Sequence, residues 1–243
     1  MPCEGLYGYS YLDPEHGDKP QGKRVETCRR WAAENGRHVW KNVLLTDSGW
    51  YSSFGGGIYR HVLDRFLSML GMPAARAKVL FIPTAAVSDE SRPYAGKCFA
   101  ELLSAGIAPN NIRIYDIDGT LALEQAVEYD AVYITGGDPG HLLRRVKETG
   151  FDEILKKLVY ANKVYVGASA GSLIATPNIG KPYTEYDAAG MDALTAGLGL
   201  VNVYLSFHNP KGAAARTDLP LPHIPLTGGQ ALAVNWAGYE LLS

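Results

Sequence analysis

Short apolar runs alternate with amphipathic segments along most of this chain. Five runs have the length and composition of strands, of which 79–82 has the pattern of a buried one: 43–45, 79–82, 112–115, 131–134 and 163–166. Between them, four segments space their apolar residues as helices do: 59–70, 94–105, 121–128 and 141–158, the last with a break at Thr149-Gly150. Strands that alternate with helices predict an α/β fold, in which helices flank both faces of a parallel sheet.

The length of 243 residues suits one α/β domain. Residues 1–38 are rich in Gly, Tyr and charged side chains, and we interpret them as an N-terminal extension. Residues 39–243 then form a single α/β domain. After residue 176 the pattern becomes irregular, with further strands expected at 201–207, 231–235 and 239–241.

The composition argues against several classes of function. The net charge of -2 gives no reason to expect nucleic acid or an anionic membrane as a partner. No apolar run approaches the roughly 20 residues of a membrane span, and no signal-peptide pattern opens the chain. Cys3, Cys28 and Cys98 form no CxxC pair, which favours reduced thiols in a cytoplasmic protein. The six histidines include no HExxH, and we assign no metal and no cofactor.

The segment Gly167-Ala168-Ser169-Ala170-Gly171 follows the last of the five predicted strands and leads into the helix-prone Ser172–Ala175. A tight turn of this kind between a strand and a helix can present a serine hydroxyl as a nucleophile. Glycines at 167 and 171 allow the close packing that the turn requires. The alternative interpretation is an ordinary turn that happens to contain a serine.

Sites in parallel α/β sheets lie at the carboxyl ends of the strands. This rule brings the loops after residues 46, 82, 134 and 167 together, so Ser169 and the turn Gly136–Gly140 should share one crevice. An oxyanion there needs two donors. The amide of Ala170 is one by construction of the turn, and Gly137-Asp138 should supply the other. Phosphate binding is disfavoured because no Lys-Ser/Thr follows the glycines.

A serine nucleophile needs a base, usually a histidine that a carboxylate orients. Two histidines follow Ser169. His208 comes directly after the apolar run 201–207, at a strand end, whereas His223 lies in a proline-rich segment typical of surface or edge structure. We therefore predict His208 as the base. Glu185 and Asp187 both lie between serine and histidine, and their spacing points both side chains the same way, so periodicity does not separate them.

With these residues in hand, the chain resembles the aspartyl dipeptidase and cyanophycinase family of serine peptidases. The resemblance runs from about Val43 to the C-terminus and is most specific at 134–138, 167–172 and 190–194. It implies a class I glutamine amidotransferase-like fold, a flavodoxin-like three-layer sandwich. Family members use a Ser-His-Glu or Ser-His-Asp triad, which implies Ser169 as nucleophile, His208 as base and Glu185, in preference to Asp187, as acid. The implied oxyanion hole consists of the amides of Ala170, Gly137 and Asp138.

The resemblance also implies a small peptide substrate, a dipeptide with N-terminal Asp, cleaved through an acyl-enzyme on Ser169. The substrate carboxylate then needs a cation, for which Lys181 is the first candidate and Arg216 the second. Two alternatives remain: an esterase of the α/β-hydrolase type, and a non-catalytic amidotransferase-like domain that binds a small ligand. The sequence leaves open whether the protein is a homo-oligomer.

Overall fold

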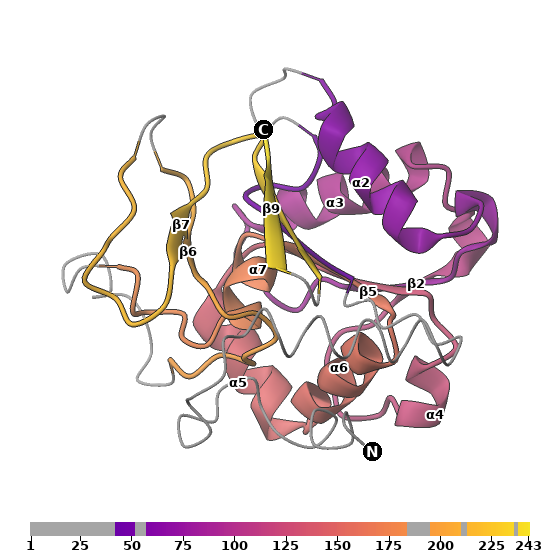
Figure 1. Ribbon diagram of the computed structural model, residues 1–243. Helices are drawn as coiled ribbons and strands as arrows, with labels where there is room; N and C mark the ends of the chain where they lie inside the picture. The colour runs from indigo at the N-terminus through magenta and orange to yellow at the C-terminus, as the bar shows by residue number, and fades with distance from the viewer. Residues whose placement is uncertain (1–41, 52–56, 184–194, 210–212, 236–237) are drawn as a thin grey trace, which may run out of the picture.

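The computed structural model describes residues 42–51, 57–183, 195–209, 213–235 and 238–243. Its centre is a seven-stranded sheet with the order β3-β2-β4-β5-β1-β8-β9 (Figure 1). The strands are β1 (Val43–Thr46), β2 (Val79–Ile82), β3 (Ile112–Ile114), β4 (Ala131–Ile134), β5 (Val164–Ala168), β8 (Ala231–Asn235) and β9 (Gly238–Leu242). The first five are parallel, as predicted, and β8 and β9 extend the sheet antiparallel beyond β1. The predicted extension 1–38 lies outside the described residues.

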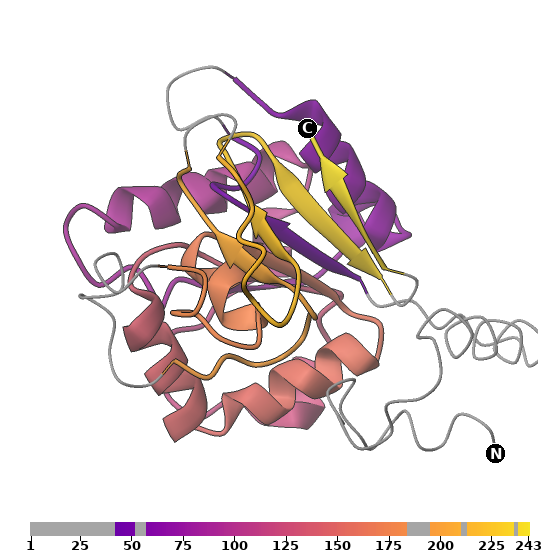
Figure 2. The ribbon, with the colours of Figure 1, turned by 60° about the vertical axis from the view of Figure 1, so that its left-hand side comes forward.

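Helices cover both faces of the sheet, which confirms the predicted α/β architecture (Figure 2). On one face lie α2 (Arg60–Leu70) and α3 (Arg92–Ser104). The other face carries α4 (Leu123–Ala126), α5 (Pro139–Glu148), α6 (Phe151–Tyr160) and α7 (Ala170–Ala175). Two short 3-10 turns, η3 (Ala74–Arg76) and η4 (Pro109–Asn111), precede β2 and β3.

The alternation of side chains along each strand explains the two layers of the core. In β2, Val79 and Phe81 pack with α2 and α3, whereas Leu80 and Ile82 pack with the helices of the opposite face. All four are buried, so the strand reads in the sequence as a continuous apolar run. This is why the parallel strands could be located from the sequence.

Of two predicted helical segments, one shows the expected break and the other is shorter than expected. The break expected at Thr149-Gly150 separates α5 from α6, because Gly150 has the left-handed φ of 69° that glycine adopts without steric cost. The segment 121–128 forms only the short α4.

The C-terminal part adds a second, two-stranded sheet, in which β6 (Tyr204–Ser206) pairs in parallel with β7 (His223–Pro225). The proline-rich segment around His223 is therefore a paired strand, and His223 itself is buried. The segment was expected at the surface or at a sheet edge: β7 is an edge strand of this two-stranded sheet, whereas His223 is buried because the strand pairs with β6.

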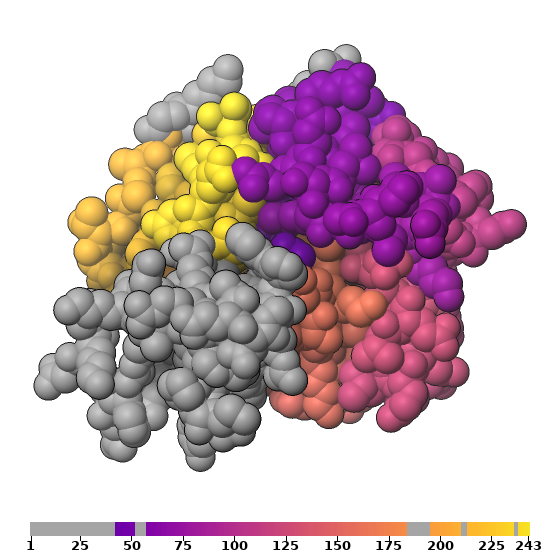
Figure 3. Space-filling view, turned by 45° about the vertical axis from the view of Figure 1, so that its right-hand side comes forward, coloured from indigo at the N-terminus to yellow at the C-terminus, as the bar shows by residue number. Residues whose placement is uncertain are grey.

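The end of the chain packs back onto α2. In the space-filling view the yellow C-terminal strands lie against the purple segment that contains this helix (Figure 3), and an ion pair joins Arg65 to Glu240. No helix in the part of the chain that the structure describes is long and apolar enough to cross a membrane.

Candidate active site

Ser169 occupies the turn between β5 and α7, the context that the sequence predicts. Its backbone is strained, with φ 46° and ψ -106°. The flanking glycines are required by packing. A Cβ at Gly167 would lie 2.6 Å from backbone atoms of Gly171 and Ser172, and a Cβ at Gly171 would lie 2.3 Å from the carbonyl oxygen of Ile134. Only glycine lets β4, β5 and α7 approach this closely.

His208 meets the serine hydroxyl. It follows β6, and its Nε2 lies 3.3 Å from Oγ of Ser169. The His208 backbone is also in the left-handed region, with φ 58°, a conformation that histidine adopts at some energetic cost. The imidazole is exposed, so a substrate can reach the pair. Two strained residues with their reactive atoms in contact are typical of a preorganised site.

Asp47 holds the other side of His208. Its Oδ1 accepts a hydrogen bond from the backbone N–H of His208 at 2.7 Å and lies 3.3 Å from Nδ1 of the ring. The Asp47 side chain is only 5% exposed, whereas the imidazole is 68% exposed. Chiefly through the hydrogen bond to Asp47, the pKa of His208 is raised above its usual value. Asp47 thus favours an imidazolium at this position.

Asp47 was not among the acids that the sequence analysis considered. Those candidates, Glu185 and Asp187, lie outside the described residues. The signal for Asp47 was nevertheless present, because it directly follows the buried strand β1, whose exit loop was expected in the crevice. Strand β1 lies next to β5, and this neighbour relation places Asp47 near the serine turn.

The turn after β4 lies directly beside the serine. A Cβ on Gly136 would lie 3.2 Å from Cβ of Ser169, so glycine keeps the space around the hydroxyl open. Gly137 has φ 140°, and a Cβ there would lie 1.9 Å from the carbonyl oxygen of Ala85, so no other residue fits. Ala170 is the first residue of α7, where an amide has no carbonyl one turn earlier to accept its hydrogen bond.

Asp138, whose amide the sequence predicts as an oxyanion donor, already has a hydrogen-bond acceptor for this amide in the structure. Its N–H donates to the carbonyl oxygen of Ala85 at 2.8 Å, and its side chain caps α5 by accepting from the N–H of His141 at 2.9 Å. Both groups are therefore engaged in holding the turn and starting the helix. The amides of Gly137 and Ala170 remain the candidates.

His223 has a structural environment. Its Nδ1 accepts from the backbone N–H of Arg216 at 2.9 Å, so in the neutral ring Nε2 carries the proton, and this atom lies 2.9 Å from Oγ of Ser206. Burial lowers the pKa of His223. Both ring nitrogens of His223 on β7 are thus engaged with Arg216 and Ser206, whereas His208 contacts Ser169.

The two candidate cations differ in their partners. Arg216 donates from Nε to Oδ1 of Asp218 at 3.1 Å, and its Nη1 lies 3.4 Å and 3.3 Å from the carbonyl oxygens of Lys181 and Tyr183. This guanidinium is thus occupied in holding its own loop, which argues against the predicted role for Arg216. Lys181 is exposed, with Nζ 6.0 Å from the centre of the Tyr204 ring.

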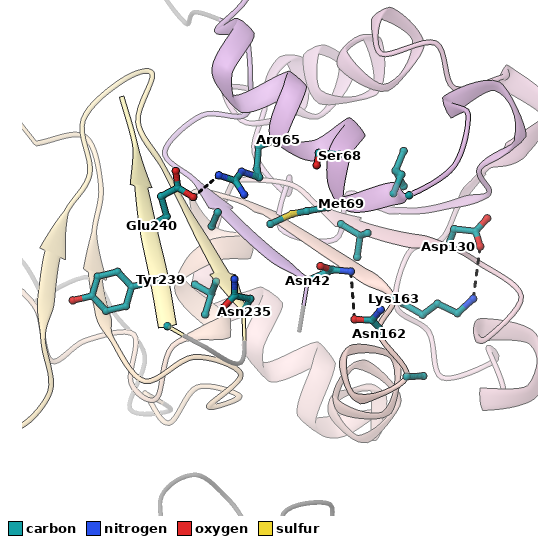
Figure 4. A pocket seen from close by; sticks show the side chains of 17 residues that line it. Asn42, Arg65, Ser68, Met69, Asp130, Asn162, Lys163, Asn235, Tyr239 and Glu240 are labelled. Atoms are coloured by element: carbon teal, nitrogen blue, oxygen red, sulfur yellow. Dashed lines mark hydrogen bonds and ion pairs between the residues drawn. The ribbon is translucent and has the colours of Figure 1, made fainter. Parts of the chain in front are cut away.

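A separate hollow of about 770 Å³ lies at the opposite edge of the sheet, where the parallel strands begin (Figure 4). Six of its polar side chains form three pairs. Arg65 bonds Glu240, Lys163 lies 3.7 Å from Asp130, and Asn42 donates to Asn162 at 3.4 Å. Because it lies at the amino ends of the strands, this hollow is distinct from the serine site.

Comparison with known proteins identifies the family of this chain. The model of peptidase family S51 matches residues 43–219, well over half of the chain. An uncharacterized peptidase of Pasteurella multocida is 28% identical over 191 residues, which cover 73% of this chain and 90% of that protein. Peptidase E of Streptomyces coelicolor is 31% identical over 57% of this chain, although the matched stretch spans only 52% of that relative.

The three-dimensional comparison gives the same result. The crystal structure of a candidate Peptidase E protein from Listeria monocytogenes superposes with a TM-score of 0.62 and 25% identity, covering 84% of this chain and all of the other. These relatives favour the peptidase over the esterase and the ligand-binding domain. The fold, the serine turn and the family match agree, and the chain belongs to peptidase family S51, a family of serine peptidases.

Proposed function

We propose that this protein is a serine dipeptidase that cleaves short peptides with an N-terminal Asp through an acyl-enzyme on Ser169. The observation that carries the proposal is the contact series from Ser169 to His208 to Asp47. A serine hydroxyl, an imidazole and a buried carboxylate in this order form a catalytic triad, and the strained turn at Ser169 serves as its nucleophile elbow.

Each residue then has a defined step. Nε2 of His208 takes the hydroxyl proton as Oγ of Ser169 attacks the peptide carbonyl. Asp47 stabilises the imidazolium and keeps the ring oriented. The amides of Ala170 and Gly137 bind the oxyanion of the tetrahedral intermediate. The imidazolium next gives its proton to the leaving amine, and a water molecule, activated by the same histidine, releases the acyl group from the serine.

The substrate preference rests on the family and on Lys181. An aspartate side chain in the crevice needs a cation, because an unpaired carboxylate is costly to remove from water. We expect kcat/KM for Asp-Leu to exceed that for Ala-Leu and Arg-Leu. Lys181→Gln should lower the value for Asp-Leu by about tenfold, with little change for Ala-Leu.

Steady-state kinetics with the three dipeptides test this preference. Lys157→Gln is the matched control, since Lys157 is also exposed but lies on α6. Equal cleavage of all three dipeptides by the wild type would remove the acidic preference and leave the triad untouched. A uniform loss on all three in Lys181→Gln would show that Lys181 does not bind the substrate carboxylate.

The pH dependence of kcat/KM should report His208. The imidazole must be neutral to accept the serine proton, and the hydrogen bond to Asp47 raises the pKa of His208. Activity should therefore be lost, as the pH falls, at a higher pH than the usual histidine pKa of about 6.5. In Asp47→Asn the midpoint of this loss should move to lower pH, although the rate itself falls.

A profile of kcat/KM between about pH 5 and pH 9, bracketing the usual histidine pKa, measures the midpoint. His223→Gln serves as the control, because His223 does not contact the serine. If the midpoint moves in His223→Gln and stays unchanged in Asp47→Asn, the base would be His223.

A further inference from the structure

A second carboxylate is buried beneath the loop that carries Asp47. Glu101 lies on α3 and has 0% exposure. Its Oε2 accepts from the hydroxyl of Tyr133 at 2.6 Å, and its Oε1 accepts from the backbone N–H of Tyr51 at 2.7 Å. Its main-chain oxygen accepts from the indole N–H of Trp50 at 3.3 Å. Glu101 therefore ties α3 to two successive residues of the loop after β1.

The same carboxylate supports the turn at Gly49. A Cβ on this residue would lie 2.3 Å from Oε2 and 2.5 Å from Oε1 of Glu101, so the backbone rests directly on the carboxylate. Gly49 has φ 81°, and its N–H donates to Oγ1 of Thr46 at 2.8 Å. The segment 47–51 thus lies against the Glu101 side chain, and Asp47 is two residues from the contact.

The other end of this segment is fixed to the serine turn. The N–H of Thr46 donates to Oγ of Ser172 at 3.0 Å, and that hydroxyl lies 2.8 Å from the carbonyl oxygen of Gly167. The N–H of Ser169 donates to the carbonyl oxygen of Thr46 at 3.0 Å. Asp47 consequently stands between an anchor to the serine turn and an anchor to α3.

We propose that Glu101 is a positioning residue, whose buried carboxylate fixes the turn at 49–51 and thereby holds Asp47 against His208. This inference rests on the proposed function, because it assigns Asp47 a catalytic role. It extends the site to a side chain that touches neither Ser169 nor His208. A mere packing role would be served as well by a neutral side chain, whereas a positioning carboxylate makes activity depend on its charge.

The environment of Glu101 allows that charge to change near neutral pH. Burial raises the pKa of Glu101 to about 7, against the opposing effect of the hydrogen bonds from Tyr133 and Tyr51. Among the described residues, the other titratable groups that face it are Cys98 and Lys97 on the same helix. Burial raises the pKa of Cys98 to about 12, so this thiol stays neutral. Protonation of Glu101 weakens its acceptor role, and the loop should lose its anchor as the pH falls.

The experiment compares Glu101→Gln with the wild type, with the exposed Glu124→Gln on α4 as the matched control. The rate of covalent labelling by a fluorophosphonate probe, with the labelled residue identified by mass spectrometry, is a measure that needs no knowledge of the peptide substrate. At pH 8 we expect Glu101→Gln to react about tenfold more slowly, as small displacements of a catalytic group cause. Below neutral pH the wild type should lose reactivity as Glu101 and His208 each bind a proton. In Glu101→Gln the loss should follow the binding of one proton, by His208.

Tyr133→Phe gives a second test if Glu101→Gln fails to fold. It removes the hydroxyl that stabilises the charged carboxylate and keeps the buried ring, so the acid-side midpoint should move to higher pH. A wild-type rate and an unchanged pH profile in whichever of the two variants folds would overturn the positioning role. If the wild type itself is not labelled on Ser169, the proposed function fails first, which distinguishes the two outcomes.

Discussion

Replacing Ser169 by alanine should lower kcat for dipeptide hydrolysis by about 10,000-fold or more, because the attacking atom itself is lost. The Ser169 hydroxyl contacts Nε2 of His208 at 3.3 Å and lies beside the open turn at Gly136. Alanine keeps the Cβ of serine and removes only the hydroxyl, so the fold should be retained. Initial rates with Asp-Leu, together with a thermal unfolding curve of each protein, measure the effect.

Ser68→Ala is the control for this substitution. Ser68 is exposed on α2 and lines the hollow at the opposite edge of the sheet (Figure 4), so its loss should leave kcat unchanged. A Ser169→Ala protein that hydrolyses the dipeptide at the wild-type rate would mean that another group attacks the peptide bond.

Replacing Asp47 by asparagine should lower kcat by about 1,000- to 10,000-fold, as the loss of charge at a triad carboxylate does. Asparagine keeps the size of the side chain and can still accept from the backbone N–H of His208. It no longer stabilises the imidazolium, and its amide group can favour the wrong tautomer of the ring. Initial rates at the pH optimum of each protein separate this effect from the shift in the pKa of His208.

The competing acids provide the comparison. If Asp47 is the triad carboxylate, Glu185→Gln and Asp187→Asn should retain kcat within about tenfold of the wild type, in the range of non-triad substitutions. The reverse ranking, with a severe loss in Glu185→Gln and a mild one in Asp47→Asn, would restore the acid that the family resemblance implies. The role of Asp47 would then be structural, as the acceptor of the hydrogen bond from the backbone N–H of His208.

The features that the sequence predicts well are those with local causes. Four of the parallel strands, β1, β2, β4 and β5, are buried runs because helices cover both faces of the sheet there, whereas β3 at the edge is largely exposed. The serine turn is recognisable because its strain requires glycines at fixed distances from Ser169. The choice of His208 rested on its position after a strand, and the contact with Ser169 agrees with it.

The features that could not be predicted from the sequence depend on contacts between distant segments. Asp47 and His208 are 161 residues apart, and they meet because β1 inserts between β5 and β8. Chain order alone directed attention to acids between Ser169 and His208. The amide of Asp138 is likewise unavailable because of Ala85, which belongs to the loop after another strand. Neither contact leaves a periodic or compositional signal, and the sequence marks Asp47 only by its position after β1.

The most direct test of the central claim is to locate the covalent adduct of a fluorophosphonate probe. We expect mass spectrometry of the labelled wild type to find the probe on the peptide that contains Ser169. Labelling should be absent in Ser169→Ala and strongly slowed in His208→Ala and Asp47→Asn. A probe attached to another residue, or equal labelling of Ser169→Ala and the wild type, would contradict the account.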